Sequence, residues 1–415
     1  MTIVVEKINI LIYIFADLIL YFTILRKDEL VGEAVLMQQK WTVIESSYLL
    51  MILFLSYVFL YFFYIKTKKK KVTICPNLRI IVNVKRCQYI FLTLLIIHFL
   101  YYMNTGIGKA GQTGRNSDLF RYSFLFSALQ FEGFFGIFYF TCRDKSKLYY
   151  SNIIIYIFYK IIQGWTGIIL TVFIFEFYCW VNEERKSIRY ENIKSVFLAI
   201  PAFFVGGYIY SFFKTLKEWI RFGTVTRYTY KEGLIFLAER MSFYETSCAI
   251  LQNLPRLKYY YGKENVLFRE IQEIFKYILP RIFMPNKEWR NINNLFWSVM
   301  YEGSFQVHDV TSTYIGIIPH TISIFYVDCY MGFLYIIALA ILFVLSSTLI
   351  RAFEQKKGQL DMIYFYLLMN IVQVAALGNV FSCDNIRLVT HIFILPIFLL
   401  LGGIGFGKSS GTNSG

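Results

Sequence analysis

The sequence predicts an all-α, polytopic membrane protein with about ten transmembrane helices, and three observations support this fold class. Of the 415 residues, 57% are hydrophobic and only 17% are charged, whereas a soluble domain usually carries about 25% charged residues. The apolar residues occur in blocks close to the roughly 20 residues that a helix needs to cross the hydrocarbon core. Short basic runs separate these blocks, which is typical of cytoplasmic loops.

The ten expected transmembrane helices follow from the apolar blocks. In chain order they cover residues 8–25, 47–65, 88–103, 119–141, 149–163, 165–181, 195–213, 322–350, 361–381 and 387–406. The first block is long enough to span the membrane, so we expect it to serve as an uncleaved anchor.

The short blocks 149–163 and 165–181 need a separate argument. Basic residues precede and follow the pair, at 143–147 and 182–194. Both basic stretches should be cytoplasmic, so an even number of crossings must lie between them. Gln163-Gly164 is the natural break, because glycine weakens a helix interior. We therefore expect two short helices here instead of one long helix.

The expected topology follows from that choice. The cytoplasmic side receives both termini and the segments 66–87, 143–147, 182–194 and 351–357. The outer side receives the segments 26–46, 104–118, 214–321 and 382–386. The chain thus divides into N-terminal helices (1–213), a large external segment (214–321), C-terminal helices (322–406), and a cytoplasmic tail (407–415). The composition of the tail is typical of an expression remnant.

Composition and motifs argue against several classes of function. The net charge is +15, but the basic residues lie in short runs between apolar blocks, so nucleic acid is not an expected partner. The seven cysteines form no CxxC pair, which argues against a metal site and a disulfide framework. Residues 106–111 match GxGxxG and residues 402–409 match GxxxxGKS, but neither has the strand or following helix that a nucleotide site needs. Without DxD, HExxH or GxSxG motifs, we expect no metal and no cofactor.

The external segment 214–321 is too long to be an idle connection. Two parts of it are expected to be helical. Residues 231–252 carry Glu239 and Arg240, and residues 267–278 place apolar and charged side chains on opposite faces at helical spacing. Such helices would lie on the outer membrane surface or cap a cavity.

Arginines are expected to gather at the outer face. They are Arg240 and Arg281 in the external segment, Arg115 in the second external loop, and Arg121 and Arg387 at the outer ends of spans. Guanidinium groups bind phosphate oxygens in bidentate geometry and keep their charge when partly buried, so this cluster suits a lipid-linked diphosphate. Headgroup pairing or snorkelling is the simpler explanation for a single arginine. The apolar surroundings of Arg240 and Arg281 favour a role in binding.

Candidate acid–base groups also lie in the external segment. His308, Asp309 and His320 could accept the proton of an attacking sugar hydroxyl, although a loop histidine is more often simply solvated. Glu239 and Glu245 are the alternatives. The sequence leaves the identity of the base open.

Four ionisable residues are expected within or at the ends of spans. An acid such as Asp328, near the outer end of the eighth span, is either functional or a hydrogen-bonded helix start. Glu132 and Glu176 lie inside spans, and we expect them to be paired within the helix bundle, with Lys160 as a candidate partner.

Two stretches resemble the oligosaccharide repeat-unit polymerases of the Wzy type, which build O-antigen and capsule. Residues 278–289, ILPRIFMPNKEW, resemble the "PR…P.KP" signature of that family, and residues 309–334 resemble its "NvyT…fY.DFG..G" segment. The departures are Glu288 for the second Pro, Asp309 for Asn and Cys329 for Phe. The resemblance covers roughly residues 200–400, and a large external loop followed by closing helices also matches.

The resemblance implies a GT-C-like membrane fold in the bacterial cytoplasmic (inner) membrane, with the active site facing outside. A growing glycan on undecaprenyl diphosphate would be transferred to a hydroxyl of the next lipid-linked repeat unit, so the lipid-linked oligosaccharide is both donor and acceptor. The implied diphosphate-binding residues are Arg240, Arg281, Lys287, Arg121 and Arg387. The candidate catalytic residues are His308, Asp309, His320 and Glu239, supported by Tyr326 and Asp328. Membrane lipids, a chain-length regulator and a flippase are the implied partners.

Other membrane functions remain as alternatives. An O-antigen ligase transfers the finished glycan to a lipid acceptor and would favour a prominent histidine in the large loop. A lipid-linked-oligosaccharide flippase usually has two similar halves and lacks a large external loop. A membrane acyltransferase would need a buried histidine, for which His98 and His391 are candidates.

Overall fold

The computed structural model describes most of the chain in separate stretches. They are residues 2–30, 41–69, 78–106, 122, 126, 132–165, 168, 169, 171, 172, 175, 176, 179, 192–261, 321–352 without 323 and 327, and 396–408. Helix accounts for 82% of these residues, which confirms the all-α class for the described part. The chain divides into two compact units, namely 1–66, 185–340 and 368–385, and 67–184, 341–367 and 386–415.

Two helices in the described part are long and apolar enough to cross a membrane. They are residues Val43–Phe62 of α2 (Val43–Lys69), with a mean hydropathy of 2.0, and α3 (Val84–Thr105), with 1.3. They coincide with the second and third expected spans. The expected ninth span, 361–381, and residues 387–395 of the tenth lie outside the described residues.

The surface of α2 shows how such a helix is used. Its buried face is spaced by three or four residues, at Ser46, Leu49, Leu53 and Tyr57. Its opposite face exposes large apolar side chains, at Phe54, Leu55, Phe59 and Phe62. A contiguous apolar surface of this kind suits contact with lipid tails.

The first unit is built around α1 (Thr2–Lys27), which packs against three later helices. They are α8 (Asn192–Phe222), α9 (Tyr230–Met241) and α10 (Tyr244–Gln252). The buried stripe of α1 includes Tyr13, Asp17, Leu20, Tyr21 and Ile24. The unit also contains α11 (Leu254–Tyr261) and the first part of α16 (Cys329–Ala352).

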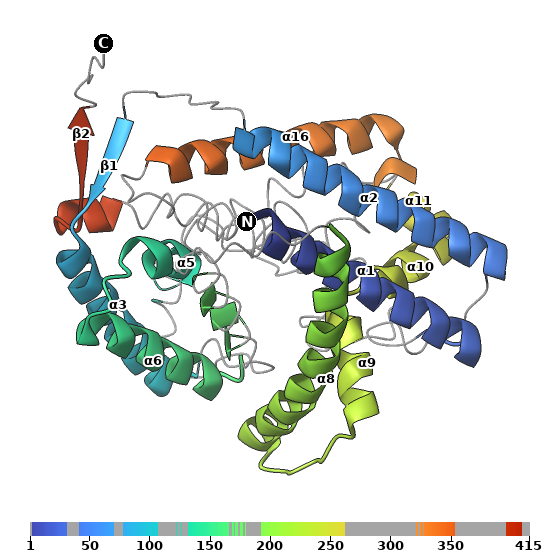
Figure 1. Cartoon of the computed structure of the whole chain (residues 1–415), viewed down its shortest axis with the longest axis horizontal. Helices are drawn as coiled ribbons and strands as arrows, with labels where there is room; N and C mark the ends of the chain where they lie inside the picture. The colour runs from blue at the N-terminus through green and yellow to red at the C-terminus, as the bar shows by residue number, and fades with distance from the viewer. Residues whose placement is uncertain are drawn as a thin grey trace. The chain divides into compact units, whose positions relative to one another are not determined.

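Helices α8 and α9 lie side by side as an antiparallel hairpin (Figure 1). Glycine permits the close approach, because a Cβ at Gly233 would lie 2.5 Å from the carbonyl oxygen of Gly207 and 2.6 Å from the Cβ of Ser211. At the start of α9, Thr229 and Glu232 form a reciprocal capping box. The cap and the glycine contact together fix where α9 begins and how closely it packs.

The hairpin shows how the beginning of the expected external segment is folded. The expected seventh span ends at residue 213, and α8 continues beyond it to Phe222. The whole of α8, at 31 residues and 1.5 Å per residue, is about 46 Å long. We also expected 231–252 to lie on the outer surface or cap a cavity. Instead, α9 runs back along α8, with Leu234 and Leu237 against Gly207 and Gly206 of the expected seventh span. The close glycine contact explains why the helix returns along its neighbour.

The second unit contains α3, α5 (Glu132–Thr141), α6 (Lys147–Ile162) and a two-stranded ribbon. Stacked aromatic rings form its core, with centroids 4.1 Å apart for both Phe91–Phe138 and Phe135–Tyr156. Buried amides join the helices as well, because Gln88 Nε2 donates to the carbonyl of Cys142 at 3.1 Å. Aromatic stacking and amide hydrogen bonds therefore hold α3, α5 and α6 together.

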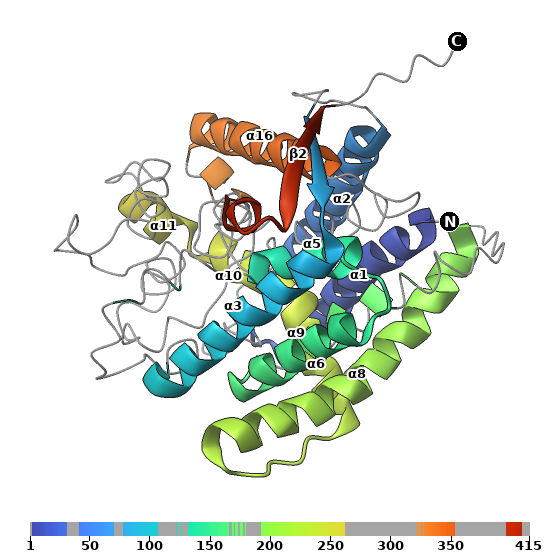
Figure 2. The same ribbon diagram turned by 90° about the vertical axis from the view of Figure 1, so that its left-hand side faces the viewer.

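The ribbon corrects the expected end of the tenth span. Strands β1 (Leu78–Val82) and β2 (Ile404–Lys408) pair antiparallel (Figures 1 and 2), so residues 404–406 are strand and not helix. Gly402 adopts a positive φ of 69°, which glycine tolerates, and the amide of Asn83 donates to the Gly403 carbonyl at 2.8 Å. The left-handed conformation of Gly402 ends the helix before the ribbon, and the bond from Asn83 satisfies the Gly403 carbonyl.

Candidate functional site

Most of the residues that the sequence singled out lie outside the described residues. They are His308, Asp309, His320, Arg281, Lys287, Arg121 and Arg387, together with Arg115. Glu239, Arg240, Tyr326 and Asp328 lie in described parts of the first unit. The described part of the candidate site is therefore the α9–α10 region and the start of α16.

Asp328 is the hydrogen-bonded start of α16. Its Oδ1 accepts from the amide of Tyr330 at 2.9 Å and from that of Met331 at 3.3 Å, which is the geometry of a helix N-cap. Asp328 and Tyr326 are both exposed. The structure thus shows the hydrogen-bonded helix start, and a functional role of Asp328 stays a prediction.

Glu239 and Arg240 occupy the last turn of α9, directly before a break in the helical chain. The break consists of Ser242 and Phe243, after which α10 begins at Tyr244. Glu239 is half-buried. The position of the break therefore sets the position of the helix end that carries both residues.

A buried carboxylate from the first helix holds this break. Asp17 is only 1% exposed. Its Oδ1 accepts from the Ser242 hydroxyl at 2.7 Å and from the amides of Phe243 at 2.8 Å and Tyr244 at 3.1 Å. Its Oδ2 accepts from the Tyr57 hydroxyl at 2.7 Å. Asp17 thus accepts from two backbone donors at the N-terminus of α10, where helix amides have no partner within the helix. The Tyr244 amide also donates to the Ser242 hydroxyl oxygen at 3.0 Å.

Aromatic rings enclose this carboxylate. Phe243 stacks on Tyr13 and on Tyr57, with ring centroids 6.0 Å apart in each case. Tyr244 meets the edge of Tyr21 at 5.6 Å. Tyr13, Asp17 and Tyr21 are four residues apart, so they share one face of α1. One face of α1 therefore supplies both the carboxylate that accepts hydrogen bonds from the break and the tyrosine rings that pack around it.

Asp17 is not among the residues that the sequence singled out, although a signal was present. Asp17 stands in the middle of the first apolar block, 8–25, where an acid is costly and tends to be functional. Its partners are 40 residues away at Tyr57 and 225 residues away at Ser242. No local pattern predicts contacts at such separations.

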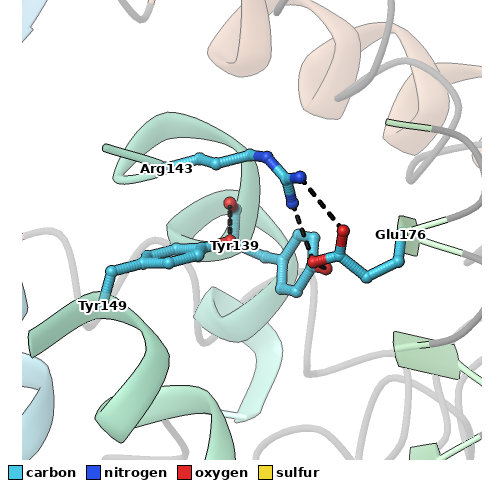
Figure 3. A network of polar contacts seen from close by, with 4 residues as sticks. All are labelled: Tyr139, Arg143, Tyr149 and Glu176. Atoms are coloured by element: carbon cyan, nitrogen blue, oxygen red, sulfur yellow. Dashed lines mark hydrogen bonds and ion pairs between the residues drawn. The ribbon is translucent and has the colours of Figure 1, made fainter. Parts of the chain in front are cut away.

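The second unit contains a different polar network, drawn in Figure 3. Arg143 binds Glu176 in bidentate geometry, with Nη1–Oε1 2.8 Å and Nη2–Oε2 3.0 Å. The Tyr139 hydroxyl donates to Glu176, and the Tyr149 hydroxyl donates to the Tyr139 carbonyl at 2.8 Å. Burial alone would lower the pKa of Arg143, but the hydrogen bonds and charge of Glu176 raise it. The guanidinium therefore stays charged and paired.

This network corrects one expected pairing and bears on the short helices. Glu176 pairs with Arg143, and not with Lys160, whose ammonium lies 5.7 Å from the ring centroid of Tyr159. The helix α6 ends at Ile162, and Gly164 follows with a φ of 84°, so the break lies where glycine predicted it. Because Glu176 reaches back to Arg143, the chain returns after the break to the end at which α6 begins.

The polar contacts of the two described networks are the hydrogen bonds to Asp17 and the ion pair between Arg143 and Glu176 with its hydrogen bonds. No group of three or more potential metal ligands occurs among the residues that the structure describes. No protein-family model matches the chain, and neither a curated protein nor a solved structure matches it.

Proposed function

We propose that the chain polymerises lipid-linked oligosaccharide repeat units into a surface polysaccharide at the outer face of the bacterial cytoplasmic membrane. The observation that carries the proposal is the position of Arg240 in the last turn of α9, a helix that packs against α1 and α8. An arginine on a helix so closely associated with apolar spans is costly and calls for an anionic partner. The resemblance of residues 278–289 and 309–334 to repeat-unit polymerases names that partner as a lipid diphosphate.

The return of the chain at Glu176 supports the outward orientation. If 149–163 and 165–181 are two crossings, the basic stretches on either side of them share the cytoplasmic side. The seventh span then leads outward, and the α8–α9 turn at 223–229 faces outside. The bidentate pair between Arg143 and Glu176 fits this hairpin, because it joins the residues on its two ends.

The proposed reaction is a glycosyl transfer. The bond between the anomeric carbon of the donor glycan and its phosphate oxygen breaks, and undecaprenyl diphosphate leaves with the bonding electrons. The acceptor hydroxyl forms the new glycosidic bond and gives its proton to a base among His308, Asp309, His320 and Glu239. Arg240 and Arg281, assisted by Lys287, Arg121 and Arg387, stabilise the charge that develops on the leaving diphosphate.

Deletion of the gene tests the proposal. The surface glycan of the deletion strain, separated on a gel, is expected to show single repeat units in place of a ladder. Complete loss of glycan from its surface anchor would instead indicate a ligase or a flippase and would contradict the proposal.

Substitution of the arginines tests the site. Arg240→Ala and Arg281→Ala are each expected to shorten or abolish the ladder at normal protein levels. Arg227→Ala is the matched control, because Arg227 lies exposed in the α8–α9 turn. Normal ladders from both Arg240→Ala and Arg281→Ala would exclude the phosphate-binding role.

Thiol labelling tests the orientation independently of activity. Val225, 64% exposed in the α8–α9 turn, and Lys147, at the start of α6, are each replaced by cysteine in a chain whose native cysteines are serine. An impermeant maleimide added to intact cells lacking an outer membrane should label Val225→Cys and not Lys147→Cys. The reverse pattern would place the region after α8 in the cytoplasm and overturn the proposal.

A further inference from the structure

We propose that Asp17 is a positioning residue that sets the place of Arg240 by anchoring the α9–α10 break from inside the helix bundle. The inference rests on the proposed function for the role of Arg240, but the anchoring itself stands on the contacts of Asp17. Asp17 lies on α1, more than 200 residues before the helices that it holds.

The anchoring follows from the number of hydrogen bonds that the Asp17 carboxylate accepts. Four donors converge on it, two of them hydroxyls and two of them backbone amides. None of these donors carries a formal charge, so the carboxylate is balanced by hydrogen bonds and by the positive end of α10. A carboxylate in this environment tolerates the loss of its partners poorly, because each would leave a buried polar group unsatisfied.

The depth of Asp17 explains why an anchor is needed. A helix that breaks beside membrane-spanning helices leaves backbone N–H groups without partners, and lipid supplies none. Asp17 lies at the middle of the expected first span, 8–25, and satisfies these groups at the α10 end of the break. The break is therefore held inside the helix bundle, so the lipid diphosphate of the proposed function has to enter the bundle from the outer face to reach Arg240.

The link to Arg240 is short. Arg240 stands two residues before Ser242, whose hydroxyl donates to Asp17 at 2.7 Å, and Met241 ends α9 between them. Phe243 is fixed on the other side by the rings of Tyr13 and Tyr57. Movement of the break would therefore move the last turn of α9 and the residues that it carries.

Cys248 provides a native reporter of the break. It lies one turn into α10 and is 0% exposed. In membranes containing the full chain, the rate at which N-ethylmaleimide modifies Cys248 is measured by mass spectrometry of the peptide. The variants are Asp17→Leu, which keeps the branching at Cγ but accepts no hydrogen bond, and Asp17→Asn, which keeps the size and one acceptor oxygen. Glu45→Gln is the matched control, since Glu45 also accepts a backbone N–H, at an exposed helix cap.

The expected result combines two readouts. Asp17→Leu should raise the modification rate of Cys248 by about tenfold or more, because several buried donors lose their acceptor, and it should shorten the glycan ladder. Asp17→Asn should keep the Cys248 modification rate and the glycan ladder close to those of the unaltered protein. Its amide oxygen can still accept from the α10 amides, and the Tyr57 hydroxyl can turn to accept from its NH₂ group. Glu45→Gln should leave both unchanged.

Two results would overturn the inference in different ways. An unchanged rate of Cys248 modification in Asp17→Leu would exclude the anchoring, and this holds independently of the glycan activity of the protein. A raised Cys248 rate with a normal ladder would exclude a positioning role for Asp17. Failure of the proposed function is separate, because it would appear as a normal ladder in the deletion strain while the Cys248 rates still report on the break.

Discussion

The two units use a buried or half-buried carboxylate in opposite ways. In the first unit, Asp17 is 1% exposed and takes all its hydrogen bonds from uncharged donors. In the second unit, the Glu176 side chain is 43% exposed and faces the guanidinium of Arg143. The first carboxylate stabilises a helix break, and the second pairs with an arginine that lies just before α6.

The difference shows which interactions depend on exact position. An Arg–carboxylate pair carries its own compensating charge and tolerates small shifts, because water reaches one partner. A buried carboxylate that accepts from hydroxyls and amides has neither a compensating charge nor access to water. Every donor must therefore stay within hydrogen-bond distance. We therefore expect substitutions at Asp17 to cost more than substitutions at Glu176.

The largest effect is expected for Asp17→Ala. Removing a carboxylate that accepts hydrogen bonds from four buried donors should lower the free energy of unfolding by about 3–5 kcal/mol. Thermal unfolding of the purified protein in detergent measures this, with Glu176→Ala as the comparison. Equal losses for the two variants would show that the two carboxylates are not used differently.

A smaller effect is expected for Arg143→Ala. The bidentate geometry favours the pair, but the exposure of Glu176 weakens it, so we expect a loss of about 1–2 kcal/mol. A double-mutant cycle with Glu176→Gln should give a coupling of about 1 kcal/mol. Strictly additive effects of the two substitutions would mean that the pair contributes nothing to stability.

Tyr57→Phe removes one of the four bonds to Asp17 and keeps the ring against Phe243. The expected loss is about 1 kcal/mol, the usual net contribution of one hydrogen bond. Tyr48→Phe on the same helix is the control, because Tyr48 is 57% exposed. Equal unfolding temperatures for both variants would show that the hydrogen bond from Tyr57 does not contribute to stability.

The smallest effect is expected from salt. Raising the salt from about 0.1 M to about 1 M shortens the Debye length from about 10 Å to about 3 Å. The coupling between Arg143 and Glu176 should fall by a few tenths of a kcal/mol. The cost of Tyr57→Phe should not change, because Asp17 and its donors are buried. A salt-sensitive cost for Tyr57→Phe would contradict the burial of that network.

Local sequence patterns predicted the helices well and their contacts poorly. Gln163-Gly164 marks a helix end because glycine adopts a positive φ at little cost, and the apolar blocks around α2 and α3 predicted two helices able to span. The extension of α8 to Phe222 was missed, because a hydropathy boundary marks the membrane surface and not the end of a helix. The strand at 404–406 was missed because its partner lies more than 300 residues away.

The candidate site could be predicted only as a set of residue types. The sequence singled out Glu239 and Arg240 from their apolar surroundings, and the structure adds that they end α9 directly before a break. Asp17 was visible as a lone acid in an apolar block, but its role depends on Ser242, Phe243 and Tyr244. Such a role follows from tertiary contacts, which composition and spacing do not contain.

Reconstituted activity tests the central claim most directly. Lipid-linked repeat units extracted from the deletion strain are incorporated into vesicles with the purified protein, without nucleotide sugars or added metal, and the products are separated on a gel. The account predicts a ladder of glycans together with release of undecaprenyl diphosphate, and loss of both in Arg240→Ala. Unchanged repeat units, or release of diphosphate without longer glycans, would contradict it.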